Sequence, residues 1–158
     1  MARFLSKARI SELTPSTPLR TVAAHASNHT LLMSVTAPAN QKLVVRFRTW
    51  GRGISATGTH VRFTVRRAGT MGTPVALTLV KKSALDTETL QAAAAGYSVQ
   101  PGTVTETGNG TVIEHFDMHP QQESASESYI VNGGETLSLW GITETNACPV
   151  DLQADIEE

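Results

Sequence analysis

The segment with the side chains best suited to chemistry is EHFDMH at residues 114–119. On a β-strand, His115, Asp117 and His119 would project from one face, because alternate residues of a strand share a face. Two imidazoles and a carboxylate are suitable ligands for zinc or iron. The two histidines, however, would lie about 13 Å apart along the strand, and a metal must hold each ligand within about 2.1 Å. One strand cannot supply both ligands, so we predict neither a metal nor a cofactor.

Two other interpretations of this segment stay open. In the simpler one, the polar side chains form the outer face of a strand whose inner face carries Val112, Phe116 and Met118. In the other, His115 or His119 forms a ring with its copies around a symmetry axis, or pairs with a neighbour's carboxylate. That arrangement would change stability near pH 6–6.5, roughly where histidine titrates.

No set of residues in the sequence is typical of nucleophilic catalysis. The one cysteine, Cys148, lies in TNACPV with no base beside it, and a single cysteine excludes an intramolecular disulfide. The glycine-rich GRGISATG at residues 51–58 joins two expected strands, whereas a phosphate loop opens a helix. We therefore expect a protein that is not an enzyme.

Period-two alternation of apolar and polar residues predicts strands that bury one face. The expected inward residues are Val45, Phe47 and Thr49 in 42–50, Val61, Phe63 and Val65 in 59–67, and Val150, Leu152, Ala154 and Ile156 in 149–157. The expected outward residues are Arg46, Arg48 and Trp50 in the first of these segments, and Arg62, Thr64 and Arg66 in the second.

Further strands are expected at residues 75–81, 97–105, 111–119, 128–132 and 135–142, with Gly- and Pro-rich turns between them. The one expected helix covers residues 84–95, in an alanine-rich stretch that Gly96 ends. The pattern predicts an all-β protein with an antiparallel β-sandwich, jelly-roll-like, and one short helix.

The chain divides into an N-terminal arm, residues 1–19, and a β-sandwich domain, residues 20–158. Pro15 and Pro18 end any helix in the arm and favour an extended segment. We expect the arm to leave the domain and to become ordered by what it touches. It lacks the apolar run and cleavage site of a secretory signal, so synthesis in the cytoplasm is expected. Its candidate partner-contact residues are Phe4, Leu5, Ile10, Leu13, Arg3, Lys7 and Arg9.

The charges are divided between the two halves of the chain. All 13 Lys and Arg residues lie in residues 1–82 with one acid, Glu12, and the other 13 acids lie in residues 83–158. The halves carry net charges of +12 and −13, although the whole chain carries −1. A sandwich that interleaves strands from both halves should cancel much of this polarity within a subunit. The remainder would suit contacts between subunits, and such assembly should weaken in about 1 M salt.

Four arginines, Arg46, Arg48, Arg62 and Arg66, would share one face if residues 42–50 and 59–67 form a hairpin. A basic face can bind nucleic acid, but stacking aromatics are sparse in a chain with 4 Phe, 2 Trp and 2 Tyr. We expect these arginines to pair with acids of the second half, and we expect no direct nucleic-acid partner. No apolar run approaches the roughly 20 residues of a membrane helix, so no membrane partner is expected.

The order of features along the chain resembles a known type of phage protein. The layout begins with VVRFRTWGRGISATGTHVRFTVRRAGTMGTPVALTLVKKS and continues with LQAAAAGYSVQPG and a strand that ends in FDMHPQ. It closes with YIVNGGETLSLWGITETNACPVDLQADIEE. Over residues 43–157 this layout is similar to that of capsid decoration (cement) proteins, small structural proteins of tailed-bacteriophage heads with a jelly-roll-like core.

The resemblance implies a virion structural protein that lies on the capsid exterior and has no catalytic residues. It implies binding to the major capsid protein, commonly as a homotrimer at local three-fold axes. Non-covalent bridging of capsid subunits would then reinforce the head against the pressure of the packaged DNA.

Two other classes of function stay open. A carbohydrate- or receptor-binding β-sandwich of a phage tail or fibre would need an exposed aromatic platform. Its candidate residues are Trp50, Tyr97, Tyr129 and Trp140. A cupin-like metalloenzyme would use His115 and His119, and would contain stoichiometric zinc or iron.

Overall fold

The structure is a computed structural model of the whole chain. It describes the backbone of residues 3–6, 20–22, 28–51, 60–67, 74–77, 79–81, 94–98, 104–105, 110–118, 123–143 and 148–157. Side chains are described for residue 29 and for residues 31–50, 60–67, 110–118, 123–143, 150 and 152–157.

The described residues form β-strands and no helix, which confirms the all-β expectation. The strands are β1 (Arg3–Ser6), β2 (Arg20–Val22), β3 (Asn28–Thr36), β4 (Leu43–Gly51), β5 (Val61–Arg67), β6 (Pro74–Leu77), β7 (Leu79–Lys81), β8 (Ala94–Ser98), β9 (Val104–Thr105), β10 (Thr111–Met118), β11 (Glu123–Ala125), β12 (Tyr129–Val131), β13 (Thr136–Thr143) and β14 (Cys148–Glu157).

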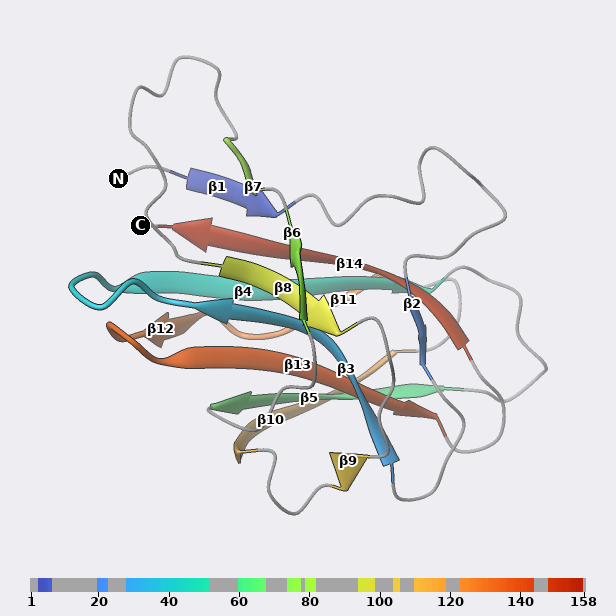
Figure 1. Cartoon of the computed structure of the whole chain (residues 1–158). Coiled ribbons are helices and arrows are strands. Elements are labelled where there is room, and N and C mark those ends of the chain that lie inside the picture. Colours follow the sequence, from blue (N-terminus) through green and yellow to red (C-terminus); the bar gives the residue numbers. More distant parts are fainter. Residues whose placement is uncertain are drawn as a thin grey trace.

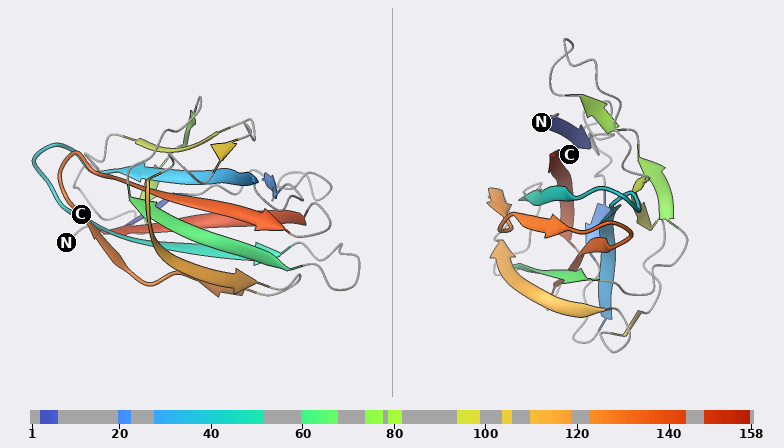
Figure 2. Two further views of the ribbon diagram at one scale, coloured as in Figure 1. Left: turned by 90° about the horizontal axis from the view of Figure 1, so that it is seen from below. Right: turned by 90° about the vertical axis from the view of Figure 1, so that its left-hand side faces the viewer.

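The strands are arranged in two antiparallel sheets (Figures 1 and 2). Sheet A has the order β11-β4-β14-β1-β7, with β12 also beside β4 and β2 beside β14. Sheet B has the order β10-β5-β13-β3-β8-β6, with β9 beside β3. Each sheet therefore contains strands from both ends of the chain.

The strand pairing is nested along the sequence. Strands β1 and β2 pair with β14, β3 pairs with β13, β4 pairs with β11 and β12, and β5 pairs with β10. The chain thus behaves as one long antiparallel ribbon whose two arms run side by side. Two further pairs, β14 with β4 and β13 with β5, join neighbouring turns of the ribbon into the two sheets.

The strands between β5 and β10 extend both sheets on the side away from β10 and β11. Strands β8 and β6 continue sheet B beyond β3, and β7 continues sheet A beyond β1. The expected single strand at residues 75–81 is therefore two strands in different sheets, because β6 ends at Leu77 and β7 begins at Leu79.

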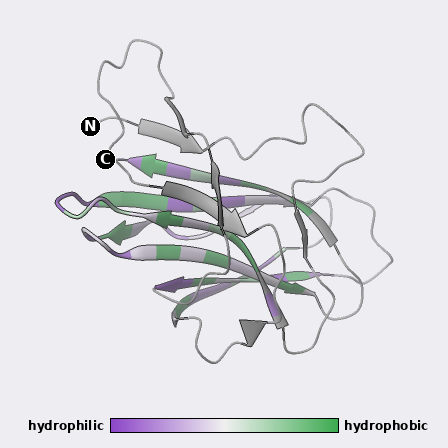
Figure 3. Cartoon of the chain, viewed as in Figure 1, coloured by the Kyte–Doolittle hydropathy of each residue, from purple (hydrophilic) through white to green (hydrophobic). Residues whose placement is uncertain are grey.

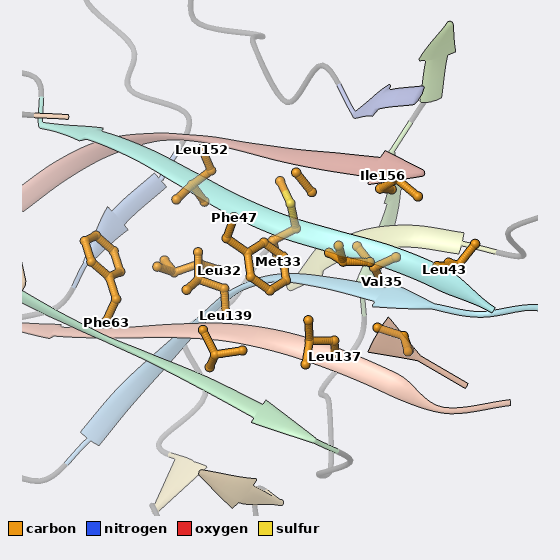
Figure 4. Close-up of a cluster of buried hydrophobic side chains, with 14 of the residues drawn as sticks. Leu32, Met33, Val35, Leu43, Phe47, Phe63, Leu137, Leu139, Leu152 and Ile156 are labelled. Carbon is orange, nitrogen blue, oxygen red and sulfur yellow. The ribbon is translucent and has the colours of Figure 1, made fainter. Parts of the chain in front are cut away.

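An apolar core fills the space between the sheets, and its residues come from alternate positions of the strands (Figures 3 and 4). The expected inward sets of β4 and β14 are confirmed, since Val45, Phe47 and Thr49 and then Val150, Leu152, Ala154 and Ile156 are buried. Phe63 on β5 stacks with Phe116 on β10, with ring centroids 5.1 Å apart. Burying a large apolar side chain contributes about 1.5–3 kcal/mol, so this alternation selects which face of each strand turns inward.

Two local expectations differ from the structure. Residues 84–93 of the expected helix lie outside the described residues, and its last two, Ala94 and Ala95, belong to β8. Their backbones pair with Thr36 and Val35 of β3, so sheet pairing prevails there over the helix propensity of alanine. The expected 42–50 and 59–67 hairpin is wrong, because β4 lies in sheet A and β5 in sheet B.

The N-terminal segment is also placed differently where it is described. Residues 3–6 form β1, which pairs with β14 on one side and β7 on the other. This part of the expected arm is a strand within sheet A, so an arm that leaves the domain is not confirmed for residues 3–6. Because Arg3 is the register partner of Glu157, the described ends of the chain lie side by side (Figure 1).

Two connections between the sheets pack against each other at one end of the sandwich. The turn after β12, residues 132–135, lies against the turn after β3, residues 37–41. The amide of Gly134 donates to the carbonyl of Ala37 at 3.2 Å, and the amide of Ala37 donates to the carbonyl of Glu135 at 3.0 Å. These bonds fix the register between the two turns.

Candidate interaction surface

Among the described side chains, those between the two sheets are mainly apolar. The central ones include Phe47, Leu139 and Leu152, all no more than 1% exposed (Figure 4). Among the residues with described side chains, no group of three His, Cys, Asp or Glu residues is arranged to hold a metal ion.

In the described part of residues 114–119, the polar residues expected on the outer face lie outward, as the simpler interpretation expects. His115 and Asp117 are exposed on β10, while Met118 is buried and Phe116 packs against the core. Asp117 accepts a hydrogen bond from Nε of Arg62 at 3.3 Å. His119 lies outside the described residues.

Part of the outer face of sheet B is buried, contrary to expectation for two residues of β5, whereas Arg62 of the same strand is exposed. Arg66 and Thr64, expected to face outward into solvent, are both 0% exposed. The guanidinium of Arg66 lies 5.3 Å from the ring centroid of Trp140, which is itself fully buried on β13. Trp140 Nε1 donates to Ser138 Oγ at 2.9 Å, and Ser138 Oγ donates to the carbonyl of Arg66 at 3.3 Å. These contacts form a second buried layer, which sequence alternation alone did not reveal.

The outer face of sheet A, by contrast, is open and carries both signs of charge. We call this surface the charged face, and its described members are Arg46, Arg48, Trp50, Glu123, Gln153 and Asp155. The register places Glu123 beside Trp50 across β11 and β4, and it places Gln153 beside Arg48 and Asp155 beside Arg46 across β14 and β4. A row of bases and an aromatic residue on β4 is thus flanked by acidic and amide side chains on both neighbours.

Arg48 is the centre of this surface. Its guanidinium forms an ion pair with Glu123 through both Nε and Nη2, and its guanidinium carbon lies 5.4 Å from the ring centroid of Trp50. The hydrogen bond from Arg48 is the largest cause that lowers the pKa of Glu123 below its usual value, and Trp50 adds to this effect. The carboxylate therefore stays ionised at neutral pH and holds Arg48 over the indole.

The described ion pairs all join the basic half of the chain to the acidic half. They link Arg48 with Glu123, Arg62 with Asp117, and Arg67 with Glu135. This agrees with the expectation for Arg48 and Arg62, whereas Arg46 donates to the carbonyl of Ser126 and Arg66 lies over the ring of Trp140. A hydrogen bond from the backbone of Asn132 is the main cause that lowers the pKa of Glu135, with Arg67 as a further cause.

A polar contact ties the edges of the two sheets together. The carboxylate of Glu114 on β10 accepts a hydrogen bond from the Tyr129 hydroxyl at 2.8 Å and from the amide of Glu127 at 3.2 Å. Burial is the first cause that raises the pKa of Tyr129, and the Glu114 carboxylate is the second. The Tyr129 hydroxyl therefore serves as a fixed donor between the sheets.

The candidate contact residues from the sequence lie mostly outside the described part of the chain. The backbones of Arg3, Phe4 and Leu5 belong to β1, and their side chains are not among those described. Lys7, Arg9, Ile10 and Leu13 are outside the described residues. From sequence, the charge that remains after pairing was expected to suit contacts between subunits, and the outward set of β4 was the signal that marks the charged face.

Comparisons with known proteins add no assignment to this geometry. No family model matches the chain, and no curated protein or solved structure matches it either. Within the described residues, no helix is long and apolar enough to cross a membrane. Among the described residues, the surface most suited to binding is the charged face.

Proposed function

We propose that this chain is a virion structural protein, a decoration protein that binds the outer surface of a phage head. The nested strand order supports a jelly roll, the double-sheet architecture found in viral capsid and lectin domains. In a jelly roll a long antiparallel ribbon is wound into two sheets, and the pairs β3–β13, β4–β12 and β5–β10 fit that winding. The layout resemblance to decoration proteins points the same way.

The single observation that carries this proposal is the charged face. Arginine and tryptophan are the residue types most enriched where protein interfaces bind tightly, and both lie at its centre in Arg48 and Trp50. Their geometry is set before binding, because Glu123 holds the guanidinium over the indole. A preorganised surface loses less side-chain entropy on association, which suits non-covalent bridging of capsid subunits.

The proposed partner is the major capsid protein, with self-association of this chain as a homotrimer. Mixed charges in adjacent rows favour one orientation of the partner, because a shifted orientation places like charges together. The proposal needs no catalytic residue, cofactor, nucleic acid or membrane.

The test is binding to empty capsids assembled from the major capsid protein encoded in the same genome. Arg48→Glu places a like charge beside Glu123 on the charged face, and it should weaken capsid binding by about tenfold or more, as expected for a central interface arginine. Arg62→Glu is the matched control, because Arg62 forms a comparable exposed ion pair with Asp117 on sheet B. Co-sedimentation over a range of protein concentrations measures both.

Two results would contradict the proposal. Absence of binding by the unaltered protein at micromolar concentration would remove the capsid role, and equal weakening by the two charge reversals would remove the charged face as its contact surface. Raising the salt to about 1 M should reduce binding, because exposed charges are screened within a few ångströms there.

The alternative, a glycan- or receptor-binding module of a tail or fibre, has fewer of its residues in place. Trp140 is fully buried, and the hydroxyl of the half-buried Tyr129 donates to Glu114. Trp50 is the partly exposed indole of the described surface, and Arg48 lies over its ring. Glycan-array binding that is lost in Trp50→Ala would favour this alternative over the capsid role.

A further inference from the structure

Strand β1 is attached to the domain in an unusual way. It is four residues long and is inserted between β14 and β7, so both of its edges are paired. Phe4, Leu5 and Ser6 have a register partner on each side, and Arg3 pairs with Glu157. The position it occupies, between β14 and β7, is called the β1 slot below.

The connection from β1 to the rest of the domain is long. Residues 7–19 separate Ser6 from β2, which begins at Arg20, and they include Pro15 and Pro18. Thirteen residues can span at most about 45 Å. A folded domain of this size is about 40 Å across, so β1 can reach the corresponding slot of an adjacent molecule.

The β1 slot matches β1 in length, and its β14 side carries acidic residues. On the β14 side, the register partners of Arg3 and Leu5 are Glu157 and Asp155. On the β7 side, the register partner of Phe4 is Lys81. An occupant of the slot should therefore be a short extended segment, and residues 3–6 of another copy have the same sequence and the same register. Exchange of an identical element keeps every contact of the unexchanged protein and is a low-cost route to association.

We propose that β1 exchanges between copies of this chain, with residues 3–6 of one molecule occupying the β1 slot of another. A connection of this length gives β1 an effective concentration of about a millimolar for its own slot. In the free protein at about micromolar concentration, β1 therefore occupies the slot of its own molecule. Exchange becomes significant where copies are held close together, as they would be in an oligomer.

The test uses the full-length protein with two single-cysteine variants, Leu5→Cys and Asp155→Cys, each in a Cys148→Ser background. Residues 5 and 155 are register partners, and antiparallel partners lie about 4.5–5.5 Å apart at Cα, within the range of a disulfide. One variant carries a size tag, the two are mixed at about 1 mM to match the effective concentration, and copper–phenanthroline oxidises them. A covalent heterodimer then reports β1 of one chain beside β14 of the other.

The expected result is about tenfold more heterodimer than from the control mixture of Leu5→Cys with Asp117→Cys, because Asp117 is exposed on β10 far from the slot in the pairing order. The double variant Leu5→Cys/Asp155→Cys, oxidised in dilute solution, should form an intrachain disulfide. This disulfide locks β1 in the slot of its own molecule. This locked protein should stay monomeric at about 1 mM by light scattering.

Three outcomes would overturn the inference. They are heterodimer no more abundant than in the control mixture, a locked protein that still associates to the same extent, and failure of the dilute double variant to form its intrachain disulfide. The last also serves as the folding check, because the disulfide requires β1 to lie beside β14. No capsid is present in these experiments, so their failure leaves the proposed decoration role to its own test.

Discussion

Gly133→Ala is expected to destabilise the protein more than Gly134→Ala, although only Gly134 has a positive φ, of 80°. A Cβ at residue 133 would lie 2.1 Å from the carbonyl oxygen of Ala39 and 3.1 Å from that of Pro38. Both obstacles are backbone atoms, so no side-chain rotation relieves the clash. A Cβ at residue 134 meets nothing within 4 Å.

The size of the destabilisation by Gly133→Ala follows from the backbone shift that the added Cβ requires. Relieving the contact at residue 133 requires the turn at residues 37–41 to shift by about 1 Å, since ordinary contacts of this kind exceed about 3 Å. Such a shift would break the two backbone hydrogen bonds between Ala37 and the facing turn, each worth about 1 kcal/mol. With overpacking strain added, the expected cost is about 3 kcal/mol. Gly134→Ala carries only the left-handed backbone penalty of about 1–2 kcal/mol.

The assays are urea unfolding, which gives the free energy of unfolding, and thermal unfolding, which gives Tm, both followed by tryptophan fluorescence and circular dichroism. About 3 kcal/mol corresponds to a fall in Tm of about 6–12 °C for a chain of this length, against about 2–8 °C for Gly134→Ala. The reasoning would be refuted if Gly134→Ala were the more destabilising of the two, or if Gly133→Ala left Tm unchanged. Either result would mean that the turns at residues 37–41 and 132–135 are not in contact.

Three further outcomes are expected. Ser138→Ala should cost about 1–3 kcal/mol in urea unfolding, because it leaves the buried Nε1 of Trp140 without its acceptor, and the same change should cost less in a Trp140→Phe background. Glu135→Gln should lower the urea midpoint at pH 7, and the difference from the unaltered protein should shrink as pH falls below the usual carboxyl value of 4.5, because a lowered folded-state pKa confers stability that acid removes. Glu123→Gln should follow the same pH pattern, because Arg48 lowers the pKa of Glu123.

The sequence predicted best those strands that bury one face and expose the other. In β4 and β14, period-two alternation identified every buried residue from Val45 to Thr49 and from Val150 to Ile156. These strands obey the simple pattern because their outer face, the charged face, lies in solvent. Alternation there reports burial directly.

Strand β3 was not predicted because its pattern is interrupted. Leu32 and Met33 are adjacent in sequence and both belong to the core. The register with β13 shifts between Leu139 and Trp140, which leaves one extra residue on β3. Beyond that residue, the alternation of inward and outward side chains is offset by one position. A bulge of this kind breaks the period of two, so alternation does not detect the strand.

The burial of Arg66 and the strands that pair with β4 could not be predicted from the sequence, for a different reason. Both depend on which strands are neighbours in space, and consecutive strands usually pair. Here the connection from β4 to β5 crosses between sheets, which places Arg66 against Trp140 of β13 instead of beside Arg48. Polar residues that were expected to face solvent, such as Arg66, are therefore buried.

The division of charge along the chain is a consequence of the same topology. Nested pairing joins the first half of the sequence to the second, so every described strand pair except β1–β7 combines a strand from residues 1–82 with one from residues 83–158. Bases and acids are therefore register partners in three of these ladders, Arg3 with Glu157, Arg46 with Asp155 and Arg62 with Asp117, and a pairing of the charged strands within either half would oppose like charges. The exception places Phe4 of the basic N-terminal segment opposite Lys81 of β7, where charge gives no such selection.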